Sequence, residues 1–184
     1  MAVCTYQAIS GQLSKVFPAP EMVDNVIPFI KGEEEKSEKE PLKIWGAYRD
    51  GRIVPATEPV ITAQCIRVAA SDGHLAAVFV SFERKPSREE MLAAWAGFSG
   101  RPQVLKLPSA PSPFLRYLED DARPQTRLDR DAGDGMAITI GRLRPDPLFD
   151  YRFVCLSHNT VRGAAGGAVL TAELLTAEKY IQAR

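Results

Sequence analysis

The chain has 184 residues, of which 45% are hydrophobic, and this is enough material for one ordinary domain. Its 23 basic and 23 acidic residues leave no net charge, and no basic stripe is interleaved with aromatic residues, so the composition argues against a nucleic-acid-binding protein. No apolar run approaches the roughly 18 residues of a membrane-spanning helix, which argues against a membrane partner.

The chain begins with an extended pattern and then becomes charged. Residues 2–8 are apolar and β-prone, which predicts a strand, and glycine and prolines break residues 10–20 into a loop. Residues 21–30 are largely apolar and predict a short helix or a short strand. Residues 33–46 begin with acidic side chains, which suit a helix N-terminus, but Pro41 argues against one unbroken helix and favours a second segment that starts there.

The middle of the chain carries the strongest strand patterns, at residues 59–70 and 75–85. The short stretch "SDGH" joins them, so we expect the two strands to pair as a hairpin. Residues 86–98 follow with apolar residues at helical spacing, Ser87 as an N-cap and acidic residues in the first turn, which predicts an amphipathic helix.

The last part of the chain combines an irregular stretch with regular elements. Residues 100–133 are proline-rich and charged, and no run in them is long enough for a core element, although "FLRYLED" fits one or two helical turns. An irregular stretch of this length is usually functional or an interface arm. Residues 136–147 and 150–159 predict two strands, and residues 162–181 predict a helix that starts with clustered glycines.

This order of elements predicts an α+β fold, with a mixed, largely antiparallel sheet and helices packed on one face. We expect a single domain over residues 1–184. The pattern shows no βαβ unit, and no Gly-x-Gly-x-x-Gly motif follows a predicted strand. We therefore expect no dinucleotide-binding domain within this chain.

The cysteines and the N-terminus bear on the cellular compartment. The three cysteines, Cys4, Cys65 and Cys155, lie far apart in apolar runs and form no Cys-x-x-Cys pair. An odd number in such contexts predicts reduced, buried thiols rather than disulfides or metal ligands. Strand alternation places Cys65 on the face of Arg67, so this thiol stays open as a reactive one. Residues 1–11 lack the charged-then-apolar layout of a signal peptide, which favours a cytoplasmic protein.

Arg67 and His74 form the strongest candidate site. Arg67 lies in an otherwise apolar strand, where a guanidinium must either reach solvent or pair with an anion. His74 follows a turn, and a histidine there can titrate near neutral pH. Together they could bind a substrate carboxylate and transfer a proton, although a loop histidine is more often structural.

Other polar residues are weaker candidates, each with a structural alternative. Gln7 ends a strand, where a buried glutamine usually satisfies backbone groups. Glu33 and Lys36 share a face if they lie on a helix and could present a carboxylate and an ammonium to a substrate, although such charged runs are more often solvated. Asn159 precedes a helix, which is typical of a cap. Gly163 belongs to a cluster that permits close packing against another backbone or a flat ligand.

Several stretches, in their order along the chain, closely resemble the C-terminal domain of aspartate-semialdehyde dehydrogenase in its archaeal and fungal branch. They are "QAISG", "DNVIPFIKGEEEK", "CIRVAASDGHLAAVFVSFERKPS", "LPSAPSPFLRYLEDDARPQTRLDRD" and "LSHNTVRGAAGGAVLTAELL". This resemblance covers nearly the whole chain. It implies the catalytic and dimerisation domain, similar to the C-terminal domain of glyceraldehyde-3-phosphate dehydrogenase, of a homodimer or homotetramer. The family reduces β-aspartyl phosphate to aspartate semialdehyde with NADPH and releases phosphate, in the synthesis of lysine, threonine, methionine and isoleucine.

The resemblance also implies a role for each candidate residue near the substrate. Arg67 would bind the substrate's carboxylate, and His74 would be the acid/base catalyst that activates a nucleophilic cysteine. Gln7 would orient the substrate beside the thioester. Glu33 would hold the substrate's amino group, and Lys36 would hold its phosphate.

The resemblance implies contacts with the cofactor, but it does not extend to the family's nucleophile or to its cofactor-binding domain. Asn159 would face the nicotinamide of NADP, and Gly163 would lie beside the same cofactor. In the family, the nucleophilic cysteine and the NADP-binding domain precede "QAISG", in a segment that this chain does not contain, and Cys4 lies in the wrong place to substitute. We therefore expect this chain alone to bind no NADP and to be inactive. Gln12 and Leu13 also depart from the small residues that usually follow this motif.

Two alternatives remain open. Malonyl-CoA reductases resemble the same branch and use the same thioester chemistry, and Glu33 is the discriminating position because they would need different residues where the amino group binds. The chain could also be a non-catalytic, truncated dimerisation module, with residues 100–131 as an interface arm.

Overall fold

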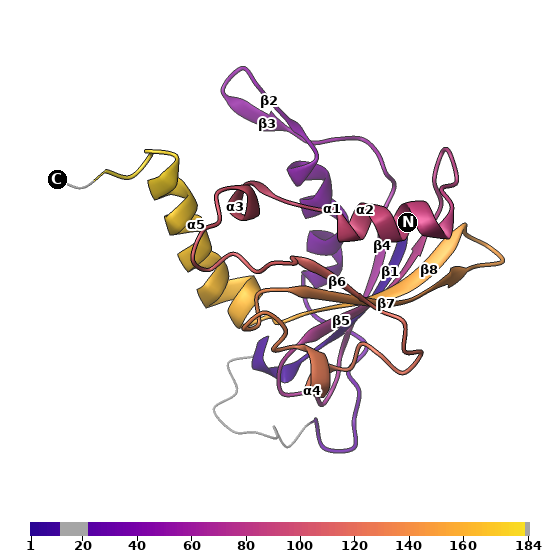
Figure 1. Ribbon diagram of the computed structural model, residues 1–184. Helices are drawn as coiled ribbons and strands as arrows, with labels where there is room; N and C mark the ends of the chain where they lie inside the picture. The colour runs from indigo at the N-terminus through magenta and orange to yellow at the C-terminus, as the bar shows by residue number, and fades with distance from the viewer. Residues whose placement is uncertain (12–21, 183–184) are drawn as a thin grey trace.

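A mixed sheet of six strands forms the centre of the structure (Figure 1). The computed structural model describes residues 1–11 and 22–182. Strands follow the order β4-β1-β5-β8-β7-β6, in which β1–β4 and β6–β7 are parallel and the other neighbours are antiparallel. Their bounds are β1 Ala2–Gln7, β4 Thr62–Arg67, β5 His74–Val80, β6 Leu115–Leu118, β7 Ile138–Pro145 and β8 Tyr151–Ser157. The predicted α+β class with a mixed, largely antiparallel sheet is confirmed.

The predicted hairpin of β4 and β5 is wrong, because β1 lies between these strands. Gln7 at the end of β1 is the direct partner of Arg67 at the end of β4. The connection from β4 to β5 passes over the end of β1, where the N–H of Ile9 donates to the carbonyl oxygen of Ala70 at 2.9 Å. Alternating apolar residues predict a strand, but they carry no information on which strand lies beside it.

The expectation that the chain has no βαβ unit is also wrong. α1 (Glu33–Ile44) connects the parallel neighbours β1 and β4. Its charged sequence fits its place beside the outer edge of β4, where none of its residues is buried. The carboxylates of Glu34 and Glu38 accept the N–H groups of Cys65 and Ala63 at 3.1 and 3.0 Å. They satisfy donors that would otherwise be unpaired at the edge of the sheet.

Pro41 lies inside α1, which is one helix and not two segments. A proline in a helix interior removes one backbone donor. Here the loss falls near the C-terminal end, where the helix stops at Ile44 and the N–H of Trp45 donates to the Pro41 carbonyl oxygen at 2.9 Å. The predicted break at this residue is therefore wrong.

Helices cover one face of the sheet, as predicted. Directly paired residues across a sheet point to the same face, and the register links Cys65 at one edge to Tyr117 at the other. Ser37 of α1 lies against Cys65, with Oγ and Sγ 3.7 Å apart. On α2 (Arg88–Ala96), Trp95 stacks on Tyr117 with ring centroids 5.8 Å apart.

The start of α2 follows the prediction. Ser87 Oγ accepts the N–H of Glu90 at 3.0 Å, and Glu90 Oε2 accepts the N–H of Ser87 at 2.7 Å. This reciprocal capping box satisfies two donors that have no partner within the helix. Met91 then packs with Leu143 and Tyr151 in a buried cluster.

Residues 100–133 contain more regular structure than the sequence suggests. α3 (Arg101–Val104), β6 and α4 (Thr126–Asp129) all lie in this stretch. The segment expected as helical turns is strand β6, because it pairs with β7, with Leu115 opposite Ile138. A partner so remote in the sequence leaves no local signal. The single-domain expectation and the interface-arm role of this stretch stay predictions.

A small hairpin, β2 (Ala47–Arg49) and β3 (Arg52–Val54), projects from the end of α1 at the top of Figure 1. Asp50 and Gly51 form its turn with φ values of 51° and 78°. Positive φ at both central residues is typical of the two-residue turns that match the twist of a hairpin.

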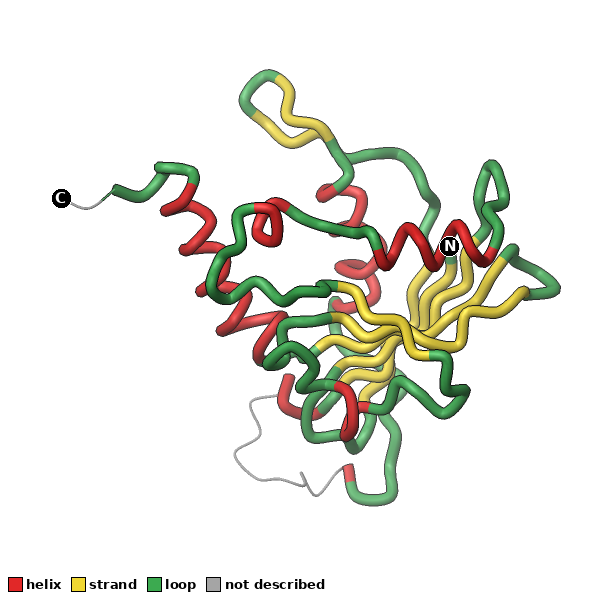
Figure 2. The backbone as a smooth tube through the Cα atoms, in the orientation of Figure 1, coloured by secondary structure: helices red, strands yellow, loops and turns green. Residues whose placement is uncertain are grey.

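The C-terminal helix is present as predicted, and the apolar segment near the N-terminus is not. A π-helical turn (Val161–Ala165) leads into α5 (Gly166–Ala177), which lies to the side of the sheet (Figure 2). Residues 23–30 form neither a helix nor a strand, apart from one bridge of Ile27 to Arg67. The loop predicted at 10–20, with its departures Gln12 and Leu13, falls mostly outside the described residues. Within the described part of the chain, no helix is long and apolar enough to cross a membrane.

Candidate functional site

Most of the predicted site residues meet at one end of the sheet. Gln7 and Arg67 end the parallel strands β1 and β4 and are direct partners. His74 begins β5, which runs antiparallel to β1 and therefore starts at the same end. The first turn of α1 adds Glu33 and Lys36.

Ala8 links Arg67 to His74. Its carbonyl oxygen accepts a hydrogen bond from Arg67 Nη1 at 2.6 Å, and its N–H donates to His74 Nδ1 at 3.1 Å. Ala8 has no exposed surface, and Arg67 is 4% exposed. The arginine and the histidine therefore meet through the residue that follows β1, and not across a hairpin.

Glu33 connects the helix to the sheet. Its Oε1 accepts from Lys36 Nζ at 2.8 Å, and its Oε2 accepts from Gln7 Nε2 at 3.3 Å. Gln7 Nε2 also lies 3.3 Å from Thr5 Oγ1, which fixes the amide. The hydrogen bond from Lys36 lowers the pKa of Glu33, and the same contact raises the pKa of Lys36. The predicted sharing of a helix face by these two residues is confirmed, and both stay charged at neutral pH.

Burial dominates the electrostatics of Arg67 and His74. Desolvation lowers the pKa of Arg67, although the negative charge of Glu33 acts in the opposite direction. Arg67 Nε is buried and has no hydrogen-bond partner in the part of the chain that the structure describes. Burial and the positive charge of Arg67 together lower the pKa of His74 to about 4. The site thus holds a neutral imidazole beside a guanidinium whose binding capacity is not used up, and an entering anion would complete it.

Asn159 is tied to the turn before His74. Its Oδ1 accepts the N–H of Gly73 at 2.8 Å, and its Nδ2 donates to Ser10 Oγ at 2.9 Å. Gly73 has φ of 93°, and a Cβ there would lie 3.3 Å from side-chain atoms of its neighbours, so the turn requires glycine. Asn159 therefore joins the loops on both sides of the site rather than capping the helix that follows it.

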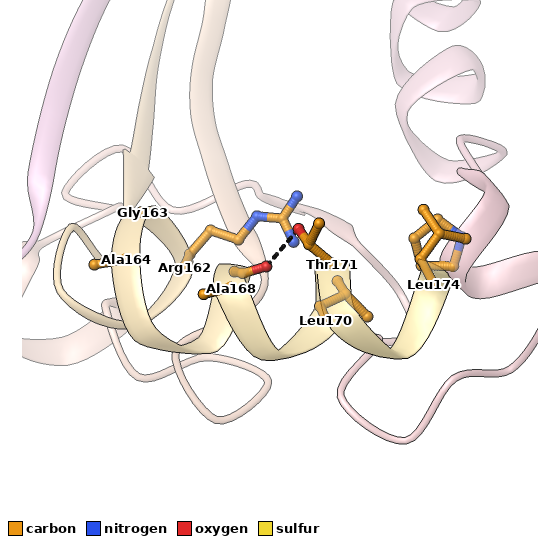
Figure 3. A pocket seen from close by; sticks show the side chains of 9 residues that line it. Arg162, Gly163, Ala164, Ala168, Leu170, Thr171 and Leu174 are labelled. Atoms are coloured by element: carbon orange, nitrogen blue, oxygen red, sulfur yellow. Dashed lines mark hydrogen bonds between the residues drawn. The ribbon is translucent and has the colours of Figure 1, made fainter. Parts of the chain in front are cut away.

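Gly163 lies elsewhere, in a groove along the start of α5 (Figure 3). The groove has a volume of about 380 Å³. Arg162 extends along it toward Thr171 in Figure 3, and its guanidinium lies 4.6 Å from the ring centroid of Phe114. Burial lowers the pKa of Arg162. A Cβ at Gly163 would meet only the carbonyl oxygen of His158, at 3.9 Å, so this glycine borders open space.

Other glycines of the cluster have structural reasons. A Cβ at Gly166 would come within 2.5 Å of Met136 Sδ, and one at Gly167 would come within 2.5 Å of the Arg162 carbonyl oxygen. At these two positions the close packing expected of the cluster occurs inside the chain. Gly163 is the member that remains available to a ligand.

Several residues of the site escaped the sequence analysis. Ala8 acts through its backbone, and nothing in its side chain marks it. Arg130 Nη1 donates to Ser71 Oγ at 2.7 Å, and Thr160 Oγ1 donates to Asp72 Oδ1 at 3.4 Å, so both hold the turn that precedes His74. Arg130 lies in a charged run within a stretch that was predicted to be irregular, so the sequence did not indicate its contact with the turn.

The three cysteines are free thiols that differ in burial. Cys65 is fully buried, whereas Cys4 and Cys155 are partly buried, and all three are free. Burial raises the pKa of Cys155 to about 11. The sequence left Cys65 open as a reactive thiol, but no surface of it is accessible to a substrate. Among residues 1–11 and 22–182, no group of three or more His, Cys, Asp or Glu side chains could hold a metal ion.

Comparison with known proteins identifies relatives of nearly the whole chain. The family model described as semialdehyde dehydrogenase, dimerisation domain, matches residues 1–162. Aspartate-semialdehyde dehydrogenase of Archaeoglobus fulgidus is 46% identical over 179 residues, which are 97% of this chain and 51% of the relative. Malonyl CoA reductase (NADP) of Metallosphaera sedula is 37% identical over 185 residues, which are 99% of this chain and 52% of the relative.

A solved structure agrees with these sequence matches. Aspartate semialdehyde dehydrogenase with NADP from Candida albicans has a TM-score of 0.86 to this chain at 37% identity. The match covers 98% of this chain and 51% of that one. This chain thus spans about half the length of the curated relatives it matches.

Proposed function

Since the chain belongs to the semialdehyde dehydrogenase dimerisation-domain family, we propose that it is the substrate-binding and dimer-forming part of an NADP-dependent aspartate-semialdehyde dehydrogenase. The resemblance of its motifs to the archaeal and fungal branch of these enzymes is confirmed by the relatives it matches. Such an enzyme reduces β-aspartyl phosphate to aspartate semialdehyde and releases phosphate. The chain by itself is proposed to be inactive.

The observation that carries this proposal is the meeting of Arg67, His74 and Glu33 at one end of the sheet. The substrate carries a carboxylate, an ammonium and a phosphate. The buried guanidinium of Arg67 has an unpaired Nε and would take the carboxylate. Glu33 would take the ammonium, and Lys36, with 56% of its side chain exposed, would reach the phosphate.

Two further residues would act at the reacting carbon. Gln7 Nε2 is held by Thr5 and Glu33, so its amide has a fixed direction and could orient the substrate. His74 would face the reacting carbonyl oxygen, since its Nδ1 is turned toward Ala8. We assign these roles as part of the proposal.

Residues at the start of α5 fit a bound nicotinamide. Gly163 follows Asn159 closely in the chain, has no side chain and borders open space, so a cofactor that lies against Asn159 could pass near its backbone. Asn159 has both ends of its amide engaged, and it would therefore support the ring's position by holding the loops of Ser10 and Gly73. When bound, NADPH supplies the hydride. That this chain alone binds no NADP remains a prediction.

For the dimer, we propose the sheet face that α1 and α2 leave uncovered. Tyr6 on this face is 37% exposed, although it lies in a strand with neighbours on both sides. Aromatic residues are enriched at subunit interfaces. The assembly would be a homodimer, or a homotetramer built from two such dimers.

A malonyl-CoA reductase-like function is the second candidate. The relative from Metallosphaera sedula supports it, because it matches almost the whole chain. Glu33 favours the first candidate, since a carboxylate paired with Lys36 and Gln7 suits a substrate that bears an ammonium. A non-catalytic dimerisation module is the third outcome to test.

The test joins this chain to the remaining half of the Archaeoglobus fulgidus relative and measures turnover with aspartate semialdehyde, phosphate and NADP, and separately with malonyl-CoA and NADPH. We expect activity with aspartate semialdehyde only, and none from the chain alone. Arg67→Lys should raise KM at least tenfold because the bidentate fork is lost, and His74→Asn should lower kcat by 10² or more. Each tenfold change corresponds to about 1.4 kcal/mol of free energy. Arg49→Lys on the exposed β2–β3 hairpin is the matched control.

Preference for malonyl-CoA would favour the second candidate. A folded, dimeric chimera without activity on either substrate would favour the dimerisation module. Equal effects of Arg67→Lys and His74→Asn on kcat and KM would show that the two roles are misassigned.

A further inference from the structure

Three arginines gather at the end of the sheet that is far from the candidate site, and they form an arginine patch of Arg142, Arg144 and Arg152. We propose that this patch binds the carboxylates of Asp120 and Asp121 of a second copy of the chain, so that the two copies dock through two equivalent contacts. The proposal rests on the proposed function only for the sheet face that forms the dimer. The contact itself is argued from the charges at one end of that face.

The register of the strands places the patch on the uncovered face of the sheet. Arg144 on β7 and Arg152 on β8 are direct partners, so their side chains share a face. From Arg152 the pairing continues to Phe79 on β5 and to Ala2 on β1. Ala2 shares its face with Tyr6, because alternate residues of a strand point the same way. The patch is therefore continuous with the face proposed for the dimer.

A bulge brings Arg142 to the same place. The pairing of β7 with β8 shifts between Gly141 and Arg144. Within this bulge Arg142 has φ of 58°, which is uncommon for a residue with a side chain. The carbonyl oxygen of Arg142 accepts a hydrogen bond from Arg144 Nη1 at 2.9 Å. Bulges re-aim side chains, and this one adds a third positive charge beside two others.

The patch has more positive charge than the chain neutralises. Among the described residues, its only salt bridge joins Arg152 Nε to Asp146 Oδ2 at 3.3 Å. Burial lowers the pKa of Arg144, and the charges of Arg142 and Arg152 lower it further, although Asp121 and Asp146 act in the opposite direction. Like charges directly opposite on a sheet repel each other. A further anion would therefore stabilise the patch.

Two unpaired carboxylates border the same face. Asp120 and Asp121 follow β6 and are exposed. The chain then crosses this face, because a Cβ on Gly141 would come within 2.5 Å of the Arg123 carbonyl oxygen. Within one copy, Arg142 Nη1 donates to the backbone carbonyl oxygen of Asp121. The carboxylates of Asp120 and Asp121 form no salt bridge in the described part of the chain.

A positive and a negative group that lie side by side on one face complement each other under a two-fold axis. In such an interface the same surface of both copies is used, so each contact occurs twice. The arginine patch of one copy would then face Asp120 and Asp121 of the other. A second copy is the occupant that we propose, because the chain itself carries the complementary charge and the matching family model is described as a dimerisation domain.

The test reverses the charge on each side of the contact and measures association of the chain by sedimentation equilibrium. One variant carries Arg144→Glu with Arg152→Glu, and the other carries Asp120→Lys with Asp121→Lys. We expect each variant alone to dimerise at least roughly a hundredfold more weakly than the native chain, because like charges then meet in both contacts. An equimolar mixture should form heterodimers with close to native affinity, because opposite charges then meet in both contacts.

The matched control is Arg49→Glu with Arg52→Glu. These arginines are also direct partners on two strands, but they lie on the exposed β2–β3 hairpin. The control changes the net charge by the same amount, and we expect it to dimerise like the native chain. Circular dichroism checks the fold of every variant.

Three results would overturn the proposal. They are a native chain that stays monomeric, reversed variants that dimerise as tightly as the native chain, and folded variants whose mixture stays monomeric. The last result would assign the patch to another anion, such as free phosphate or a carboxylate in the remaining half of a longer protein.

If a reversed variant loses its native circular dichroism spectrum, the neutral changes Arg144→Gln and Asp121→Asn replace it, singly and combined. Residues that touch across the interface should give effects on the dimer dissociation constant that do not add, and additive effects would also count against the contact. The dimer is measured without substrate or cofactor. An inactive chimera that still dimerises through this contact would sink the enzyme assignment alone, and an active chimera without it would sink this proposal alone.

Discussion

Arg67 and Arg123 are both anchored in the fold, but they are held in opposite ways. Arg123 forms a two-point ion pair with Asp129, in which Nε lies 2.7 Å from one carboxylate oxygen and Nη2 contacts the other. Arg67 is 4% exposed, and within residues 1–11 and 22–182 its side chain bonds only to the Ala8 carbonyl oxygen, through Nη1, and its Nε has no partner. Among the described residues, no carboxylate forms a salt bridge with it. The ion pair of Arg123 with Asp129 holds a loop, whereas Arg67 keeps a buried charge that a ligand can neutralise.

The two surroundings also move the acid–base equilibria in opposite directions. The hydrogen bonds that Arg123 donates to Asp129 raise the pKa of Arg123, and the same contact lowers the pKa of Asp129. Burial lowers the pKa of Arg67. One cation is thus stabilised by its partner and the other is destabilised by its site. That difference implies that the same substitution should have different effects at the two positions.

The largest effect is expected from Arg123→Met. This change leaves the Asp129 carboxylate buried, and the N–H of Gln125, at 2.7 Å, is then its only hydrogen-bond partner among the described residues. Removing one partner of a buried pair typically costs several kcal/mol, and the partial exposure of Arg123 reduces the loss that we expect here. Urea unfolding followed by circular dichroism measures it, and Arg127→Met on the exposed side of α4 is the control. A loss below about 1 kcal/mol would mean that this pair does not hold the loop.

The sequence predicted which residues form the site, but it did not predict the contacts that connect them. Arg67 and His74 were expected to meet across a hairpin, and they do lie close together, but a third strand separates them. Ala8 directly follows that strand, and its backbone N–H and carbonyl oxygen connect His74 to Arg67. Backbone contacts leave no trace in residue type, so this part of the site could not be predicted.

Elements with local signals were predicted correctly, and elements made by remote partners were not. The capping pattern of Ser87 and Glu90 lies within one turn of helix, and α2 begins there as expected. Strand β6 exists because Leu115 pairs with Ile138, far along the chain, and it was mistaken for helical turns. Pro41 was given too much weight, since a proline near the end of a helix costs little once the helix is docked on β4.

A pH titration should show the second effect, at His74. The unfolded chain binds a proton on this side chain near pH 6.5, but the folded chain does so only near pH 4. Between these values the unfolded state holds more protons, so stability is complete above pH 6.5 and is lost as the pH falls toward 4. Partial solvent access limits the loss to about 2 kcal/mol.

The measurement is the free energy of unfolding at several pH values for the native chain and for His74→Gln. The variant should lose the slope in this window, while His158 contributes equally to both proteins and cancels. Parallel curves would show that the folded chain protonates His74 as readily as the unfolded one. In that case the surroundings of Arg67 and His74 would not disfavour a charged side chain, and they would not differ in this respect from the loop of Arg123 and Asp129.

The smallest change in stability is expected from Arg67→Met, the counterpart of Arg123→Met. It removes one hydrogen bond to Ala8, but it also removes a desolvated cation without a counter-ion, so the two terms should nearly cancel, within about 1 kcal/mol. The variant should also raise the pKa of His74 from its value of about 4, because Arg67 is one of the causes that lower it. Urea unfolding and the imidazole NMR signals of the ¹⁵N-labelled chain report the two effects. A loss as large as that of Arg123→Met would mean that Arg67 is a structural arginine like the other. A small loss with a raised His74 pKa would mean that its charge is kept for a ligand.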